Sequence, residues 1–377
     1  MSRLLTEEQN IICGSIRDFM EKELKPLLNE LDRKGEFPDE IYRKGFELGL
    51  NSFEIPEQFG GLGLDYATAG VMYEEMGYYD AGCALTMCTT NLALKPVLIA
   101  GTDAQKQMFC SRILEQGYAA FALTEPGGGS DVASTRTKAV REGDEYVING
   151  TKCFITNGGY ASAYIVVATT DPGKGARGLT AFIVEREREG ISIGKEEDKC
   201  GIRTSNTVEV VFEDVRIPVE NRLGNEGEGF KIAMKTLDLS RPFVSAIAVG
   251  MAQRALDEAV KYSKERVTFG KPICKFEALQ FMMADMDIKV ETARQMYRHA
   301  VELMSKKMPF SREAAITKCY CTDVLNQVVT DAVQILGGYG YMREYPVEKI
   351  FRDAKIFQIF EGTNQVQRVV ISGHLLG

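Results

Sequence analysis

A glutamate close to the carboxyl end of the sequence has neighbours that suit a general base. Glu361 follows the apolar Ile359 and Phe360 and precedes Gly362, which can adopt positive φ and make a sharp turn. Thr363 predicts the N-cap of a last helix, so Glu361 would stand at the entry to that helix. Partial burial raises the pKa of a carboxylate and makes it a stronger base. The alternative is a surface glutamate near a helix terminus.

The segment Leu123–Asp131 could bring backbone amides against a ligand. Its sequence is LTEPGGGSD, and the three consecutive glycines let the backbone approach a flat or anionic group closely. The segment is neither a Walker loop nor a strand–GxGxxG–helix fingerprint, so a Rossmann dinucleotide site is not predicted. A flexible surface loop is the alternative interpretation.

Further positions could contact a planar cofactor that carries phosphates. Phe154 and Thr156 are two apart in a strand-like run, so a ring and a hydroxyl would point to the same side. The guanidinium of Arg266 has a planar donor fork that suits a pyrophosphate. Taken alone, the first pair also fits a strand end before a glycine turn, and Arg266 fits a solvated charge at a helix end.

Composition narrows the classes of function. The net charge of −8 gives no general attraction to nucleic acid, and no apolar run is long enough to predict a membrane span. Nine cysteines without a CxxC pair indicate reduced thiols and a cytoplasmic location. Only two histidines are present, so no metal site is predicted and a carboxylate is the expected acid–base group.

The elements that would position these residues change in type along the chain. We expect an α+β protein with a helical domain over residues 1–120, a β-sandwich or barrel over 121–235 and helices over 236–377. Asn149-Gly150 predicts a two-residue hairpin in the middle part. Met286, Val290, Ala293, Tyr297, Ala300 and Met304 form the apolar stripe of one long helix, and residues 313–336 predict another that ends at Gly337-Gly338.

Together these motifs, in this order, closely resemble the acyl-CoA dehydrogenase family. The resemblance covers essentially the whole chain and includes Asp238–Pro242, Gln334–Gly338 and Arg352–Lys355. The short- and medium-chain enzymes, including bacterial butyryl-CoA dehydrogenases, are the most similar members. The resemblance implies an N-terminal helical domain, a middle antiparallel β domain and a C-terminal four-helix bundle. It also implies an FAD cofactor and a homotetramer, a dimer of dimers.

The resemblance assigns roles residue by residue. The residues that it implies for FAD are Phe121, Leu123, Thr124, Gly129 and Ser130 in the glycine-rich loop, Phe154, Ile155 and Thr156 in the flavin-facing strand, and Thr363 and Gln365 at the last helix. Contacts with FAD across a subunit interface are implied for Arg266, Phe269, Gln334, Ile335, Gly337 and Gly338. Substrate contacts are implied for Ser130, Asp238, Arg241 and Gly362.

The position of the base divides this family. Isovaleryl- and long-chain-type enzymes carry it just before the arginine that matches Arg241, where this chain has Ser240. The resemblance therefore implies Glu361 as the catalytic base. Glutaryl-CoA dehydrogenases share that base but need a cation at the pocket floor, for which Lys95 is the candidate. The chain departs from the family at Phe360, where tyrosine is common.

A second departure is Glu277, which stands where a glutamine usually helps to bind FAD. A carboxylate would repel a pyrophosphate, so Glu277 is not predicted to be a site residue.

The implied reaction is α,β-dehydrogenation of an acyl-CoA to a trans-2-enoyl-CoA in fatty acid β-oxidation. The glutamate removes the α-proton, a hydride passes to the flavin N5, and an electron-transferring flavoprotein accepts the electrons. Three alternatives stay open. They are an enoyl-CoA reductase that runs the reverse reaction, an acyl-CoA oxidase and a non-catalytic flavoprotein of the same fold. Acyl chain length is not predicted beyond a preference for short or medium chains.

Overall fold

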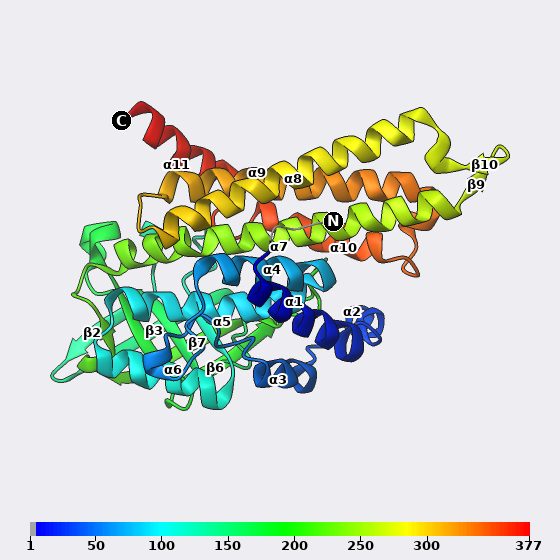
Figure 1. Cartoon of the computed structure of the whole chain (residues 1–377). Helices are drawn as coiled ribbons and strands as arrows, with labels where there is room; N and C mark the ends of the chain where they lie inside the picture. The colour runs from blue at the N-terminus through cyan, green and yellow to red at the C-terminus, as the bar shows by residue number, and fades with distance from the viewer. Residues whose placement is uncertain (1–4) are drawn as a thin grey trace.

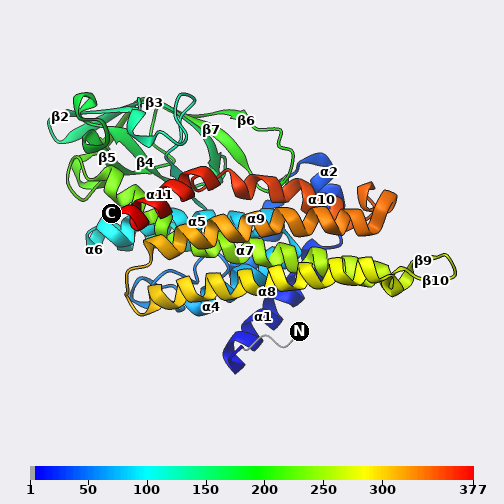
Figure 2. The same ribbon diagram turned by 90° about the horizontal axis from the view of Figure 1, so that it is seen from above.

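The computed structural model describes residues 5–377 and confirms the expected order of a helical part, a sheet and a second helical part. The sheet lies beside one end of the long helices α7, α8 and α9, and the hairpin β9–β10 projects at their opposite end (Figures 1 and 2). Residues 1–4 lie outside the described part of the chain.

The first helical part carries the helix that reaches the centre of the molecule. Its helices are α1 (Glu7–Phe19), α2 (Leu28–Lys34), α3 (Asp39–Glu47), α4 (Tyr66–Tyr79), α5 (Ala81–Ala100) and α6 (Asp103–Gln116). Asp80 begins α5, because its carboxylate accepts a hydrogen bond from Cys83 N at 2.8 Å. In residues 5–377, α5 is the one helix long and apolar enough to cross a membrane, and most of it is buried within the protein.

Eight strands of the described chain form one sheet. They are β1 (Ala119–Ala122), β2 (Lys138–Glu142), β3 (Glu145–Thr156), β4 (Ala163–Thr169), β5 (Leu179–Glu185), β6 (Ile191–Glu196), β7 (Thr207–Pro218) and β8 (Arg222–Leu223). The order is β6-β7-β3-β2-β4-β5-β8, with β1 beside β4. Most pairs are antiparallel, as expected, but β4 pairs in parallel with both β1 and β2.

The predicted hairpin at Asn149-Gly150 is wrong. Strand β3 continues through both residues, and the two-residue turn lies earlier, at Gly143-Asp144 between β2 and β3. Asn149 instead exchanges hydrogen bonds with Asp214 of β7, while Gly150 stands at a register shift. A Cβ on Gly150 would lie 2.7 Å from the Cα of Thr137, so glycine here reflects close packing of the backbone.

The second helical part begins with the longest helix. The elements are α7 (Gly229–Glu265), the hairpin β9 (Val267–Thr268) and β10 (Lys271–Pro272), then α8 (Glu277–Ser305), α9 (Ser311–Leu336), α10 (Pro346–Ala354) and α11 (Asn364–Leu376). The predicted apolar stripe of α8 is buried along its whole length, and Gly337, with φ +61°, ends α9 as expected. Helices α10 and α11 pack against α9.

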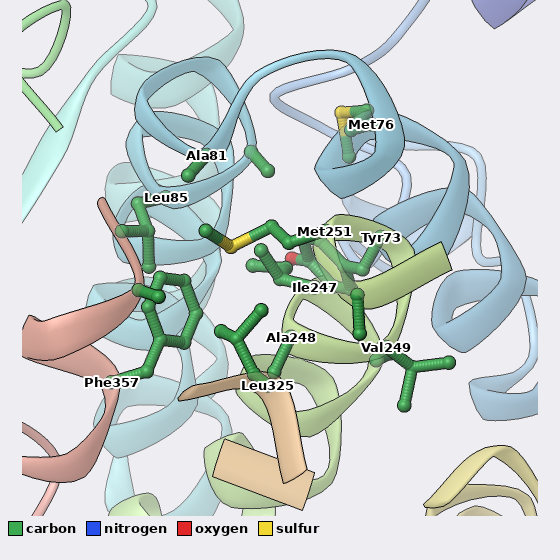
Figure 3. Close-up of a cluster of buried hydrophobic side chains, with 14 of the residues drawn as sticks. Tyr73, Met76, Ala81, Leu85, Ile247, Ala248, Val249, Met251, Leu325 and Phe357 are labelled. Carbon is green, nitrogen blue, oxygen red and sulfur yellow. The ribbon is translucent and has the colours of Figure 1, made fainter. Parts of the chain in front are cut away.

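Two buried clusters place α5 between the sheet and the long helices. Against the sheet, Ala93, Leu94 and Val97 pack on residues of β1, β4 and β5. On the other side, Ala81 and Leu85 belong to a cluster with Tyr73 and Met76 of α4, Ile247 and Met251 of α7, Leu325 of α9 and Phe357 (Figure 3). This second cluster buries Phe357 and so anchors the segment that leads to Glu361.

Candidate functional site

A partly open cavity of about 180 Å³ lies where α5, α7, the sheet and the segment before α11 meet. Its lining is mainly apolar with a few polar groups, which is typical of a small-molecule site. The lining residues are Leu85, Cys88, Thr89 and Leu92 of α5, Leu237 and Val244 of α7, Phe121, Leu123, Thr124, Gly129 and Val132, Phe154, Ile155 and Thr156 of β3, Ile202, and Phe360, Glu361 and Gly362.

Glu361 presents one carboxylate oxygen that has no partner. Ser240 Oγ donates a hydrogen bond to Oε1 at 3.0 Å, whereas Oε2 is buried and accepts no hydrogen bond within residues 5–377. Burial raises the pKa of this carboxyl, against the opposing effects of the Ser240 hydrogen bond and of Arg241, Lys318 and Lys95. The predicted buried, basic carboxylate is therefore present in a cavity.

The backbone at Glu361 takes an unusual conformation that its neighbours stabilise. Both Glu361 (φ +58°) and Gly362 (φ +84°) are left-handed, which is costly for a glutamate. Gln367 Nε2 donates to Glu361 O at 3.2 Å and to Gly362 O at 2.8 Å. Arg241 Nε donates to Glu361 O at 3.3 Å. As predicted, Thr363 is the N-cap of α11, with Oγ1 3.2 Å from Val366 N.

A buried ion pair positions the glycine-rich loop. Lys152 Nζ lies 2.8 Å from Glu125 Oε1 and 2.9 Å from Leu123 O, and Cys153 N donates to Thr124 O at 3.0 Å. Burial lowers the pKa of Lys152 to about 8, opposed by the neighbouring Glu125. For Glu125, burial is outweighed by Lys152 and by the hydrogen bonds from Arg136 N and Thr137 N just before β2, so its pKa is lowered and the carboxylate is ionised. The segment is thus a pinned loop that lines a cavity.

Phe154 and Thr156 both line the cavity, but not by the simple alternation that we expected. The register of β3 against β7 shifts between Lys152 and Ile155, and Phe154 has φ +57°. This bulge turns Phe154, Ile155 and Thr156 towards one cavity. The ring of Phe154 remains 63% exposed, so a flat face is available to a ligand.

The other residues assigned near this cavity do not line it directly. Arg241 is buried behind Glu361 and pairs with Asp238 at 2.6 Å. Thr363 caps α11, while Gln365 and Ser130 are exposed outside the lining.

A second pocket gathers the residues predicted to act across a subunit interface. Arg266, Ile335, Gly337 and Gly338 line it together with Tyr262, Thr268, Ile273, Leu336, Tyr339 and Met342. Phe269 is 90% exposed close by, and Gln334 is exposed. Arg266 follows the end of α7, about 25 positions beyond Arg241, or roughly 37 Å along the helix at 1.5 Å per residue. One chain therefore presents the two sets of residues far apart along α7, with the second set at its carboxyl end, where the β9–β10 hairpin follows (Figure 1).

Several residues near the base were missed or assigned differently from sequence. Ser240 stands at the position of the alternative base, and it donates a hydrogen bond to Glu361. Ile202 (φ +48°) reaches the cavity from a loop, and Asp353 Oδ1 accepts from its backbone N–H at 2.5 Å. The third of these residues is Lys318, which α9 buries fully. A lysine within the apolar stripe of a predicted helix is the sequence signal that could have identified it.

Three other positions singled out in the sequence have neighbours that account for them. Lys95 pairs with Glu54 at 2.7 Å and does not line the cavity, so its charge is already offset. Phe360 lines the cavity and packs edge-on against Phe357. Glu277 is exposed in the first turn of α8, where a carboxylate interacts favourably with the helix dipole.

The cavity fits a flavin ring. Apolar side chains from Phe121, Leu123 and Phe154 meet the polar Thr124 and Thr156 on one wall, which suits a flat ring with polar edges. Glu361, with its unpartnered oxygen, lines the same cavity. These residues could hold the ring in the cavity that the carboxylate also lines.

Comparison with known proteins agrees with this geometry. Residues 6–137, 120–215 and 227–376 match the N-terminal, middle and C-terminal domains of acyl-CoA dehydrogenases. The short-chain specific acyl-CoA dehydrogenase of Megasphaera elsdenii is 47% identical over 99% of both chains, and the Bacillus subtilis acyl-CoA dehydrogenase is 41% identical over 99% of both.

Solved structures show the same likeness. Butyryl-CoA dehydrogenase from Megasphaera elsdenii has a TM-score of 0.97 at 46% identity over the whole of both chains. A chain from work on the electron transferring flavoprotein of Acidaminococcus fermentans has a TM-score of 0.96 at 47% identity, again over the whole of both. The chain therefore belongs to the acyl-CoA dehydrogenase family of FAD-dependent oxidoreductases.

Proposed function

We propose that this enzyme dehydrogenates a short-chain acyl-CoA to the trans-2-enoyl-CoA, with Glu361 as the base. The observation that carries the proposal is the bare Oε2 of Glu361, which is buried and belongs to a residue that lines the same cavity as Phe154 and Thr156. A carboxylate whose pKa burial raises is matched to removing a weakly acidic proton from carbon.

Each residue around the cavity has a separate role in the proposed reaction. Glu361 Oε2 takes the α-proton, while Ser240 holds Oε1 and Gln367 holds the backbone turn. The backbone N–H of Glu361 donates to no acceptor in the described chain and is free to donate to the thioester oxygen. FAD supplies the hydride acceptor for the β-carbon. Leu85, Leu92 and the other apolar side chains of the cavity exclude water from the reacting atoms.

The preference for a short acyl chain is supported by the relatives named for short-chain and butyryl substrates. A dicarboxylic substrate is disfavoured, since its distal carboxylate needs an unpaired cation. Lys95 is the candidate in α5, but Glu54 already neutralises it at 2.7 Å. A match to the structure of a glutaryl-coenzyme A dehydrogenase complex, at 32% identity, therefore does not extend to its substrate.

The test is anaerobic bleaching of the bound flavin with straight-chain substrates from butyryl- to palmitoyl-CoA and with glutaryl-CoA. We expect the fastest bleaching with the shortest chains. Glu361→Gln should keep FAD but lose at least the roughly 10²–10⁴-fold that a general base contributes. Near-normal bleaching of Glu361→Gln would remove Glu361 as the base, and equal rates with palmitoyl-CoA would remove the short-chain assignment.

The partners follow from the same comparisons. We propose that an electron-transferring flavoprotein reoxidises the enzyme, which the likeness to the Acidaminococcus fermentans chain supports. A homotetramer is supported by the second pocket, because Arg266 lies too far along α7 to reach the flavin site of its own chain. The nine free cysteines support a cytoplasmic location.

A second candidate is the reverse reaction, enoyl-CoA reduction. It is favoured by one observation, the likeness to a chain studied for flavin-based electron bifurcation. Rates measured in both directions with the purified electron-transferring partner decide between the two. If butyryl-CoA is oxidised faster than crotonyl-CoA is reduced, the dehydrogenase is supported. If NADH-coupled reduction of crotonyl-CoA is the faster reaction, the reductase is supported. A non-catalytic flavoprotein would catalyse neither reaction.

A further inference from the structure

One buried lysine beside the base has no carboxylate partner of its own. The four lysines that are at least nine-tenths buried in the described chain are Lys95, Lys152, Lys318 and Lys349. Three of them form ion pairs, with Glu54, with Glu125, and with Asp80 and Asp353, at 2.6–2.8 Å. Lys318 is 0% exposed and forms no ion pair within residues 5–377. An ammonium so placed needs another source of stabilisation.

The ammonium of Lys318 is directed at the turn that carries the base. Its Nζ donates to Gly362 O at 2.8 Å and to Asn364 Oδ1 at 2.9 Å. Asn364 is itself fixed, because its Nδ2 donates to Asp323 Oδ1 at 2.7 Å and to Thr322 Oγ1 at 2.9 Å. Helix α9 therefore holds the residue after Glu361 through one side chain, and that side chain carries a charge.

We propose that Lys318 is a positioning residue that fixes the Glu361–Gly362 turn and whose positive charge keeps Glu361 ionised at working pH. The inference rests on the proposed role of Glu361 as the base. Lys318 would be the cation that stabilises ionised Glu361, because the deprotonated glutamate and the buried ammonium stabilise each other. Proton transfer to Glu361 then weakens the pair during turnover.

The electrostatics of the pair agree with this geometry. Burial lowers the pKa of Lys318 to about 8, and the strongest opposing effect comes from Glu361. In return, Lys318 lowers the pKa of Glu361, whose net shift is upward through burial. The other groups that act on either member are Ser240 and Arg241 of α7, Lys95 of α5, and Cys319 and Asp323 of α9. Of these, Asp323 is already bonded to Gln358, Asn364 and Arg368.

The effect on activity has a definite sign. Turnover needs ionised Glu361, so the rate falls as pH drops through the pKa of that residue. Removing the charge of Lys318 takes away an effect that lowers this pKa, and the acidic limb of the rate profile moves to higher pH. A neighbouring opposite charge changes a carboxyl pKa by about one unit or more. A loss of mere packing would slow the reaction without moving the limb.

The test compares three variants of the FAD-loaded enzyme. Lys318→Met removes the charge, Lys318→Arg restores a charge, and Asn364→Ala loosens the same hydrogen-bond network while keeping Lys318. Anaerobic bleaching with butyryl-CoA is followed across pH, and infrared difference titration reports protonation of the Glu361 carboxyl, assigned with Glu361→Gln. We expect an upward shift of about one pH unit in Lys318→Met, partial return in Lys318→Arg and no shift in Asn364→Ala.

Each outcome decides the matter. An unmoved limb in Lys318→Met, or an equal shift in Asn364→Ala, would overturn the electrostatic role. If Lys318→Met loses FAD, Lys318→Gln is measured in its place, because it keeps a donor for Gly362 O without the charge. An unmoved acidic limb in Lys318→Gln would likewise overturn the electrostatic role. A fully active Glu361→Gln would instead refute the proposed function, so the two failures are distinguishable.

Discussion

Replacing Gly362 by alanine tests how the turn at the base is held. Its φ of +84° costs an alanine roughly 1–2 kcal/mol. The new Cβ would also lie 2.7 Å from Gln367 Nε2 and 3.4 Å from Arg241 Nη2. Gln367 is 0% exposed and cannot swing into solvent, so it would lose its bonds to Glu361 O and Gly362 O, about 1 kcal/mol each. The total is about 3–4 kcal/mol.

Gly143→Ala is the matched control. Gly143 also has positive φ (+64°), but a Cβ there meets nothing within 4 Å, and the residue lies in the β2–β3 turn outside the cavity lining. This control should cost only the conformational term, roughly 1–2 kcal/mol. Denaturant unfolding of the FAD-loaded proteins measures both values. Bleaching by butyryl-CoA should slow about 100-fold in Gly362→Ala, because the carboxylate is displaced, and stay unchanged in Gly143→Ala.

Two results would refute this reasoning. Equal destabilisation by the two substitutions would mean that Gln367 does not clamp the turn. A normal bleaching rate in Gly362→Ala, despite the expected loss of stability, would mean that the conformation of this turn does not position Glu361.

The other predictions concern the hydrogen bond from Ser240 to Glu361 and the buried ion pair that positions the glycine-rich loop. Ser240→Ala removes a hydrogen bond to ionised Glu361 that is worth about 1.5–3 kcal/mol, so the acidic limb of kcat/KM should rise by about one to two pH units, at 1.36 kcal/mol per unit; an unchanged midpoint would contradict it. Lys152→Met leaves Glu125 charged and buried, and should cost about 3–5 kcal/mol in denaturant unfolding and weaken FAD retention in gel filtration. The exposed Lys195→Met should change neither quantity.

The sequence by itself determined the features that depend on local order. Period-3.6 stripes predicted α8 and α9, because each helix buries a single face whatever it packs against. Thr363 predicted the cap of α11 and Gly362 predicted positive φ, since both depend on adjacent backbone groups. The joint order of the motifs also predicted the family, which the comparisons show.

Tertiary structure decided what depends on residues far apart in the chain. Asn149-Gly150 has the composition of a turn, but pairing with Asp214 and packing on Thr137 keep it inside a strand. Ser240 and Lys318 acquire their importance only when α7 and α9 meet the Glu361 turn. Burial of that turn is what raises the pKa of its carboxylate, and burial is a property of the packed chain, because it is set by neighbours that no local spacing specifies.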